Sequence, residues 1–121
     1  MSRLFLVVEN QEDNRQILRD LLKSADYEMP EAEAGKEAIS AVARQRPSLI
    51  LMDIQLPGID GYEATRRIKA DPALSSIPII AVTSYALSGD EDKARAAGCD
   101  AYVAKPYSPS QRLAKIREYL K

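Results

Sequence analysis

The sequence predicts a doubly wound α/β domain built on a parallel sheet of five strands. Two observations carry this prediction: short apolar runs recur along the chain, and a helical pattern follows each of them. Most of these runs are continuous rather than alternating, which is typical of parallel strands buried on both faces. The expected strands cover residues 4–8, 27–34, 49–52, 77–82 and 101–104.

The second strand, YEMPEAEA (27–34), is the weakest of the five because it contains Pro30. A proline cannot donate a hydrogen bond to a neighbouring strand, so we place this segment at an edge of the sheet. With right-handed crossovers, an edge position for the second strand favours the strand order 2-1-3-4-5.

Five helices are expected from apolar residues at helical spacing and from capping residues. Asp60 is a good N-cap with Glu63 three places on, and Gly98 suits a left-handed helix end. Glu12 and Asp13 suit the positive end of the first helix dipole. The expected helices cover residues 14–24, 36–46, 61–70, 90–97 and a last segment that begins at Ser108.

Composition narrows the class of protein. The 121 residues, 45% of them apolar, suit one domain spanning 1–121. A net charge of −1 offers no positive excess for nucleic acid. The chain has no histidine, which removes histidine-based metal sites, and Cys99 alone forms no internal disulfide. No apolar stretch approaches the ~18 residues of a membrane span, so we expect a soluble, cytoplasmic protein that binds no membrane.

Polar residues follow four of the expected strands. Glu9-Asn10 follows the first, Asp53 the third, Thr83-Ser84 the fourth and Lys105-Pro106 the fifth. Each has an ordinary alternative role alone, as a helix cap, a strand end or a surface lysine. Sites in such sheets lie at the carboxyl ends of the strands, and these four strands would be contiguous. Their joint placement therefore favours one shared pocket.

The chemistry of this set suggests phosphoryl transfer. A carboxylate can attack a phosphoryl group and become an acyl phosphate. A lysine and a divalent cation would offset the charge of the transferring oxygens. Mg²⁺ is held by carboxylates, carbonyls and water, which suits this inventory.

The stretches VVENQEDNR, LILMDIQLPGIDGYE, IIAVTSYA and AGCDAYVAKPYS resemble one family over nearly the whole chain. The sequence is similar to the receiver domain of two-component response regulators, in particular the stand-alone chemotaxis and cell-division type. That resemblance implies a flavodoxin-like fold and Mg²⁺ as cofactor. The site residues it implies are Asp53 as phosphoacceptor, Glu9, Asn10, Asp53 and the backbone carbonyl of Gln55 as metal ligands, Thr83 as switch hydroxyl, Tyr102 as the aromatic coupled to it, and Lys105 as the phosphate-binding lysine.

The resemblance also implies partners. A sensor histidine kinase or a histidine phosphotransfer protein would donate the phosphoryl group, and a downstream protein would bind the surface of the fourth helix, fifth strand and fifth helix. The chain would then be a signalling phosphoacceptor, limited to self-phosphotransfer and autodephosphorylation, and not an enzyme for other substrates. It would act through another protein, unless it is part of a longer one.

Asn10 departs from the family pattern, which usually has aspartate there. An amide oxygen can coordinate Mg²⁺ but brings no charge, and Asp13 is a candidate to compensate. One alternative is therefore a degenerate receiver that binds partners without phosphorylation. Another is a Mg²⁺-dependent phosphatase with an aspartyl nucleophile. Such enzymes typically carry a second aspartate two residues after the nucleophile, where this chain has Gln55.

Overall fold

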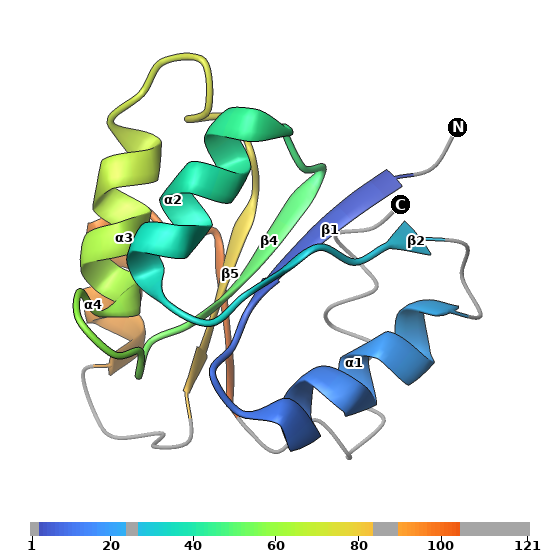
Figure 1. Cartoon of the computed structure of the whole chain (residues 1–121). Coiled ribbons are helices and arrows are strands. Elements are labelled where there is room, and N and C mark those ends of the chain that lie inside the picture. The colour runs from blue at the N-terminus through green and yellow to red at the C-terminus, as the bar shows by residue number, and fades with distance from the viewer. Residues whose placement is uncertain (1–2, 24–26, 84–89, 105–121) are drawn as a thin grey trace.

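The computed structural model describes residues 3–23, 27–83 and 90–104, and within them a parallel sheet carries helices on both faces (Figure 1). The strands are β1 (Arg3–Val8), β2 (Tyr27–Glu28), β3 (Glu31–Ala32), β4 (Leu49–Asp53), β5 (Ile79–Thr83) and β6 (Ala101–Ala104). The helices are α1 (Glu12–Lys23), α2 (Gly35–Arg44), α3 (Gly61–Lys69) and α4 (Asp90–Ala97). The expected helix from Ser108 lies outside the described residues.

The strand order confirms the prediction. The sheet runs β2-β1-β4-β5-β6 with every pair parallel, and β3 also pairs with β1. The expected second strand is therefore two short pieces at the edge, one on each side of Met29-Pro30. Pro30 has no N–H to donate, but its carbonyl accepts a hydrogen bond from the Val7 N–H at 3.0 Å. In the order 2-1-3-4-5, these two pieces together take position 2.

Alternate residues of the strands serve two separate cores. Leu6 and Val8 of β1 face the layer formed by α2, α3 and α4, whereas Phe5 and Val7 pack with Leu18 of α1. Figure 1 shows α2, α3 and α4 together on one side of the sheet and α1 on the other. Burial on both faces explains why these strands are continuous apolar runs. None of the helices in the described ranges is long and apolar enough to span a membrane.

The fourth expected strand starts two residues later than predicted. The Ile77 N–H bonds to the Leu74 carbonyl at 3.1 Å, so Ile77 closes the preceding turn although its side chain is buried. Pro78 has no N–H to offer, and β5 begins at Ile79. An apolar run marks burial, but it does not show where strand pairing begins.

Two helix-capping predictions are confirmed. Asp60 caps α3, because its Oδ1 accepts the Glu63 N–H at 2.9 Å. Gly98 ends α4 at φ 108°, and Gly58 adopts φ 76° in the β4–α3 connection. Both angles lie in the region that favours glycine.

Candidate functional site

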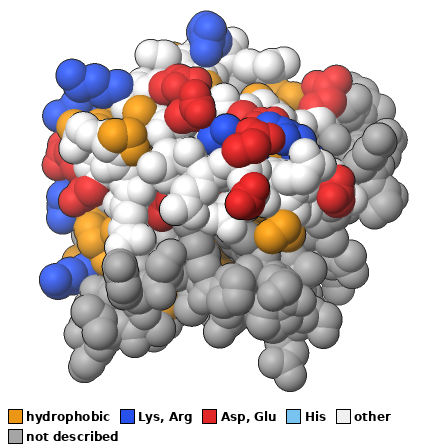
Figure 2. Space-filling view, turned by 60° about the horizontal axis from the view of Figure 1, so that its bottom comes forward, with side chains coloured by type: hydrophobic (Ala, Val, Ile, Leu, Met, Phe, Trp, Pro, Cys, Tyr) orange, Lys and Arg blue, Asp and Glu red, His pale blue; other side chains and the backbone are white. Residues whose placement is uncertain are grey.

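The site begins with two carboxylates at the ends of neighbouring strands. The β1–β4 register pairs Val8 with Met52, so Glu9 and Asp53 each lie one residue further along adjacent parallel strands. The Glu9 N–H continues the ladder to the Ala32 carbonyl at 2.9 Å. Glu9 is 1% exposed and Asp53 is 2% exposed. Figure 2 brings this end of the sheet forward and shows acidic side chains spread over its described part.

Backbone amides orient both carboxylates. The Gln11 N–H donates to Glu9 Oε2 at 3.1 Å, and the Gln55 N–H donates to Asp53 Oδ1 at 3.0 Å. In each case the donor lies two residues after the acid, where the chain leaves the strand. Each hydrogen bond fixes the direction in which the carboxylate oxygens point. Both side chains are thus held in place at the carboxyl ends of β1 and β4.

Arg15 on α1 binds the backbone at the end of β1, and this role was not predicted from the sequence. Its side chain is buried, and Nη1 donates to the Glu9 carbonyl at 2.6 Å. Its other contacts are ion pairs with Glu12 at 2.6 Å, Glu31 at 3.0 Å and Glu33 at 3.3 Å. A signal was present in the sequence, because Arg15 lies three residues before Leu18 and so shares the buried face of α1.

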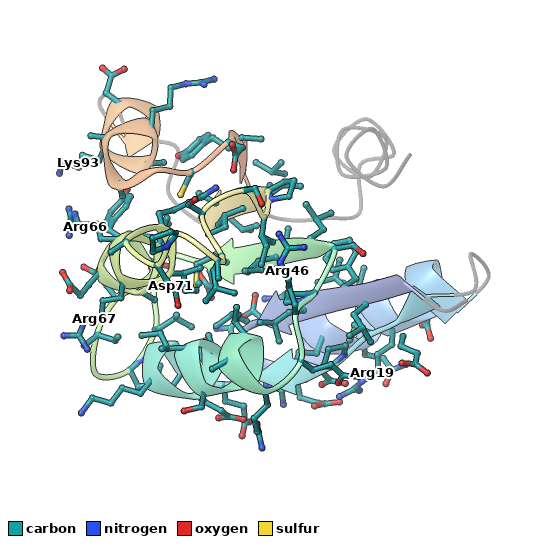
Figure 3. All side chains as sticks on the ribbon, turned by 90° about the horizontal axis from the view of Figure 1, so that it is seen from above. Arg19, Arg46, Arg66, Arg67, Asp71 and Lys93 are labelled. Carbon is teal, nitrogen blue, oxygen red and sulfur yellow. The ribbon has the colours of Figure 1, made fainter. Side chains whose placement is uncertain are left out.

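Arg19 lies one turn further along α1 and shares two of these acids. It bonds to Glu12 and to Glu31, and Figure 3 shows it among carboxylate side chains near the edge of the sheet that carries β2. Hydrogen bonds from Arg19 and Arg15 lower the pKa of Glu12 to about 2. Hydrogen bonding to Glu12 likewise raises the pKa of Arg15. The network joins α1 to the broken edge strand.

Two glycines fix the connection between β4 and α3, which follows Asp53. A Cβ on Gly61 would lie 2.3 Å from the Asp53 carbonyl oxygen and 2.7 Å from the Ile54 Cα. A Cβ on Gly35 would lie 2.6 Å from Cγ1 of Ile59. The first turns of α3 and α2 therefore approach this connection more closely than any other residue would allow.

The remaining predicted residues fall as follows. Asn10 and Gln55 are exposed and adjoin Glu9 and Asp53. Tyr102 is partly buried on β6 and packs against the core beneath α2, α3 and α4. Thr83 is the last residue of β5 and pairs with Ala104 in register. Lys105 lies outside the described residues.

The donor chemistry at this end fits Mg²⁺. Two buried carboxylates on adjacent strands repel each other, and a divalent cation between them would offset that repulsion. Asn10 and the backbone of Gln55 add neutral oxygens, and Mg²⁺ keeps waters in its remaining positions. The described residues contain no group of three or more His, Cys, Asp and Glu side chains suited to a metal. With Asn10 in place of an aspartate, Glu9 and Asp53 are the two carboxylates that these strand ends offer to a cation.

Comparisons with known proteins agree with this geometry. The family model of the response regulator receiver domain matches residues 5–117. The polar-differentiation response regulator DivK of Brucella ovis is 42% identical over 120 residues, covering 99% of this chain and 98% of that protein. The chain therefore belongs to the response regulator receiver domain family, whose members are signalling phosphoacceptors of two-component systems.

Solved structures show the same fold. A crystal structure of a response regulator from Chloroflexus aurantiacus matches with a TM-score of 0.91 at 28% identity, over 99% of this chain and 98% of that one. The receiver domain of a sensor histidine kinase from Pseudomonas aeruginosa matches with a TM-score of 0.87 at 34% identity, over 99% and 98% of the two chains. In that structure a magnesium ion is coordinated in the active-site cleft.

Proposed function

We propose that residues 1–121 form one receiver domain that accepts a phosphoryl group on Asp53 and signals through the resulting change of shape. The observation that carries the proposal is the burial of Asp53 beside Glu9 at the carboxyl ends of β4 and β1. Burying two like charges side by side is costly unless a ligand or counter-charge uses them. Both carboxylates lie at the end of the sheet where the sites of such folds lie.

The proposed reaction is direct transfer. An Asp53 carboxylate oxygen attacks the phosphorus of a phosphohistidine on a sensor kinase or phosphotransfer protein. The new O–P bond forms as the P–N bond breaks, which leaves an acyl phosphate on Asp53 and a histidine on the donor. The Gln55 N–H donates to Asp53 Oδ1 and so helps to orient the carboxylate that makes the attack.

Mg²⁺ is the proposed cofactor, and it would be held by Glu9, Asn10, Asp53 and the backbone carbonyl of Gln55. When bound, it supplies charge stabilisation for the transferring phosphoryl oxygens. Backbone amides orient the Glu9 and Asp53 carboxylates, so these ligands are positioned without a bound cation. Such preorganisation reduces the cost of assembling the ligands.

The signal would leave through Thr83, Tyr102 and Lys105. Lys105 would bind the phosphoryl group, Thr83 would move toward it, and Tyr102 would follow. The surface that changes would be formed by α4, β6 and the expected helix from Ser108. These are the fourth helix, fifth strand and fifth helix predicted from the sequence. A downstream protein would recognise that surface in its phosphorylated form.

The first prediction tests the acceptor. Incubation with acetyl phosphate and Mg²⁺ is expected to add one phosphoryl group per chain, measured by intact-protein mass spectrometry. Asp53→Ala is expected to remove the label. Asp60→Asn is the matched control, because Asp60 is an exposed aspartate of the same β4–α3 connection with a capping role.

The outcomes separate the alternatives. Label that survives in Asp53→Ala but disappears in Asp60→Asn would move the acceptor and refute the proposal. A folded wild-type chain that takes no label from acetyl phosphate or from any phosphohistidine donor would instead be a degenerate receiver. The weaker Mg²⁺ set created by Asn10 is the observation that favours this second candidate.

A further inference from the structure

Arg15 is the only buried basic side chain among the residues with described burial. Its buried charged companions in that part of the chain are Glu9 and Asp53. A guanidinium removed from water must recover its hydration through hydrogen bonds and ion pairs. The positions of the groups that bind Arg15 therefore indicate the role of this buried side chain.

One hydrogen bond of Arg15 reaches the peptide that precedes Asn10. Arg15 Nη1 donates to the Glu9 carbonyl at 2.6 Å. On the other side of Asn10, the Gln11 N–H donates to Glu9 Oε2 at 3.1 Å. The backbone of Asn10 is thus held both before and after the residue, whereas its side chain is exposed.

Arg15 is itself oriented from three directions. Glu12 belongs to its own helix, Glu31 to β3 at the sheet edge, and Glu33 to the segment before α2. A planar guanidinium gripped by several carboxylates has little freedom to rotate. The Glu9 carbonyl is consequently tied to a frame that spans α1 and the edge strand.

We infer that Arg15 is a positioning residue for the magnesium site. By holding the Glu9 carbonyl it fixes the Glu9–Asn10 peptide, and so the direction from which the Asn10 amide reaches the cation. This inference rests on the proposed function. A neutral ligand attracts Mg²⁺ less than a carboxylate does, so its placement has to be supplied by the surrounding structure.

The direction of the effect distinguishes positioning from simple electrostatics. Removing a positive charge close to a cation site would, by charge alone, strengthen Mg²⁺ binding. Loss of an outer contact that orients a ligand weakens metal binding instead. The two roles therefore predict opposite changes when Arg15 is neutralised.

Arg19 supplies a matched control within the same network. It pairs with Glu12 and Glu31 and also bonds to Gln16, but its described partners do not include Glu9. Arg19→Gln thus removes the same charge and some of the same ion pairs without releasing the Glu9 carbonyl. Arg15→Lys keeps the charge but replaces the planar fork by a single ammonium group.

The test is a Mg²⁺ titration of wild type, Arg15→Gln, Arg15→Lys and Arg19→Gln, followed by backbone amide NMR shifts. We expect Arg15→Gln to bind Mg²⁺ on the order of 10-fold more weakly. Arg15→Lys should bind with an affinity between that variant and wild type, and Arg19→Gln should match wild type or bind more tightly. Without Mg²⁺, the amide signals of Asn10 and Gln11 should shift in Arg15→Gln but hardly in Arg19→Gln.

Binding by Arg15→Gln that equals or exceeds wild type would overturn the inference. If that variant does not fold, Arg15→Lys decides the question, and an affinity equal to wild type would overturn it. The proposed function fails differently: wild type would bind Mg²⁺ yet take no label on Asp53, and the titration would still decide the role of Arg15. Wild type that binds no Mg²⁺ would overturn both.

Discussion

At the scale of single residues, the buried charges of the described chain are concentrated at one end of the sheet. Glu9, Asp53 and Arg15 are its buried charged side chains with described burial, and the first two lie in register on β1 and β4. Asn10 directly follows Glu9 and is exposed. Its amide lowers the negative charge of the site by one unit relative to the aspartate that is usual in the family. That single difference sets the Mg²⁺ affinity expected of the proposed site.

The prediction at this scale concerns Asn10→Asp. A carboxylate at this position adds a charge-to-charge attraction for Mg²⁺, which at ~4 Å and an effective dielectric of ~20 would be several kcal/mol before solvent compensation. Asn10 is exposed, so most of that is screened, and we expect a gain of ~1–2 kcal/mol, or about 5- to 30-fold in affinity. Mg²⁺ titration of both proteins measures it, and labelling at limiting Mg²⁺ should be faster in the variant.

Asp13→Asn provides the control for this prediction. Asp13 is exposed in the first turn of α1, the position from which it could replace the missing carboxylate. If Asn10→Asp binds Mg²⁺ no better than wild type and Asp13→Asn binds it worse, Asp13 already supplies that charge. The interpretation of Asn10 as a weakened ligand would then be wrong.

At the scale of elements, the connection from β4 to α3 is held by close backbone packing. Gly61, at the start of α3, approaches the Asp53 and Ile54 backbone at distances that exclude a Cβ, and a Cβ on Gly35 would lie 2.6 Å from the side-chain Cγ1 of Ile59. Asp60, which lies between Ile59 and Gly61, is the N-cap of α3. Asp53, the proposed acceptor, is therefore followed by a segment whose path is set by the starts of α2 and α3.

Gly61→Ala is expected to destabilise the domain and to slow labelling of Asp53. Alanine gains up to ~1 kcal/mol in helix propensity, but its Cβ would meet backbone atoms that cannot rotate away. Overpacking of this kind costs about 1–3 kcal/mol, and more where backbone must shift, so the net effect is a loss. Urea unfolding measures the loss through the transition midpoint.

Gly58→Ala is the companion variant in the same connection. A Cβ on Gly58 would meet nothing within 4 Å, so its cost comes from φ 76° alone, about 1 kcal/mol. It should lower stability without slowing the labelling rate. Equal effects of the two variants on labelling would show that the contact of Gly61 with Asp53 does not position the acceptor.

At the scale of the whole molecule, the sequence predicted the sheet well because burial on both faces imposes continuous apolar runs. Pro30 indicated that the second strand lies at an edge of the sheet, and the ends of the apolar runs indicated where Glu9 and Asp53 lie. Arg15 could not be assigned in the same way. Its partners Glu31 and Glu33 come from the sheet edge and the segment after it, and only tertiary packing brings them to α1.

Acid stability of the folded domain should depend on the network that joins α1 to the sheet edge. Hydrogen bonds from Arg19 and Arg15 lower the pKa of Glu12 from 4.5 to about 2. A carboxyl whose pKa is lower in the folded chain stabilises it above the unfolded pKa and loses that contribution as pH falls. The window is therefore about pH 4.5 to 2. Glu63 acts in the same direction, because hydrogen bonding to Arg67 lowers its pKa on the outer face of α3 (Figure 3).

The last prediction is that Glu12→Gln flattens the fall of the melting temperature between pH 5 and pH 2. Glu12 is exposed, so solvent screens its ion pairs and the effect should shrink further in 1 M salt, where the Debye length is about 3 Å. At pH 2 the variant and wild type should melt at similar temperatures, because pH 2 is close to the pKa of Glu12 in the folded chain and most of the stabilisation from its pairs is then lost. Asp13→Asn, which removes a neighbouring exposed charge from the same helical turn, should leave the wild-type slope in place. A slope that is unchanged in Glu12→Gln would show that the pairs of Glu12 with Arg15 and Arg19 do not stabilise the fold in solution, since they would then contribute nothing that protonation could remove.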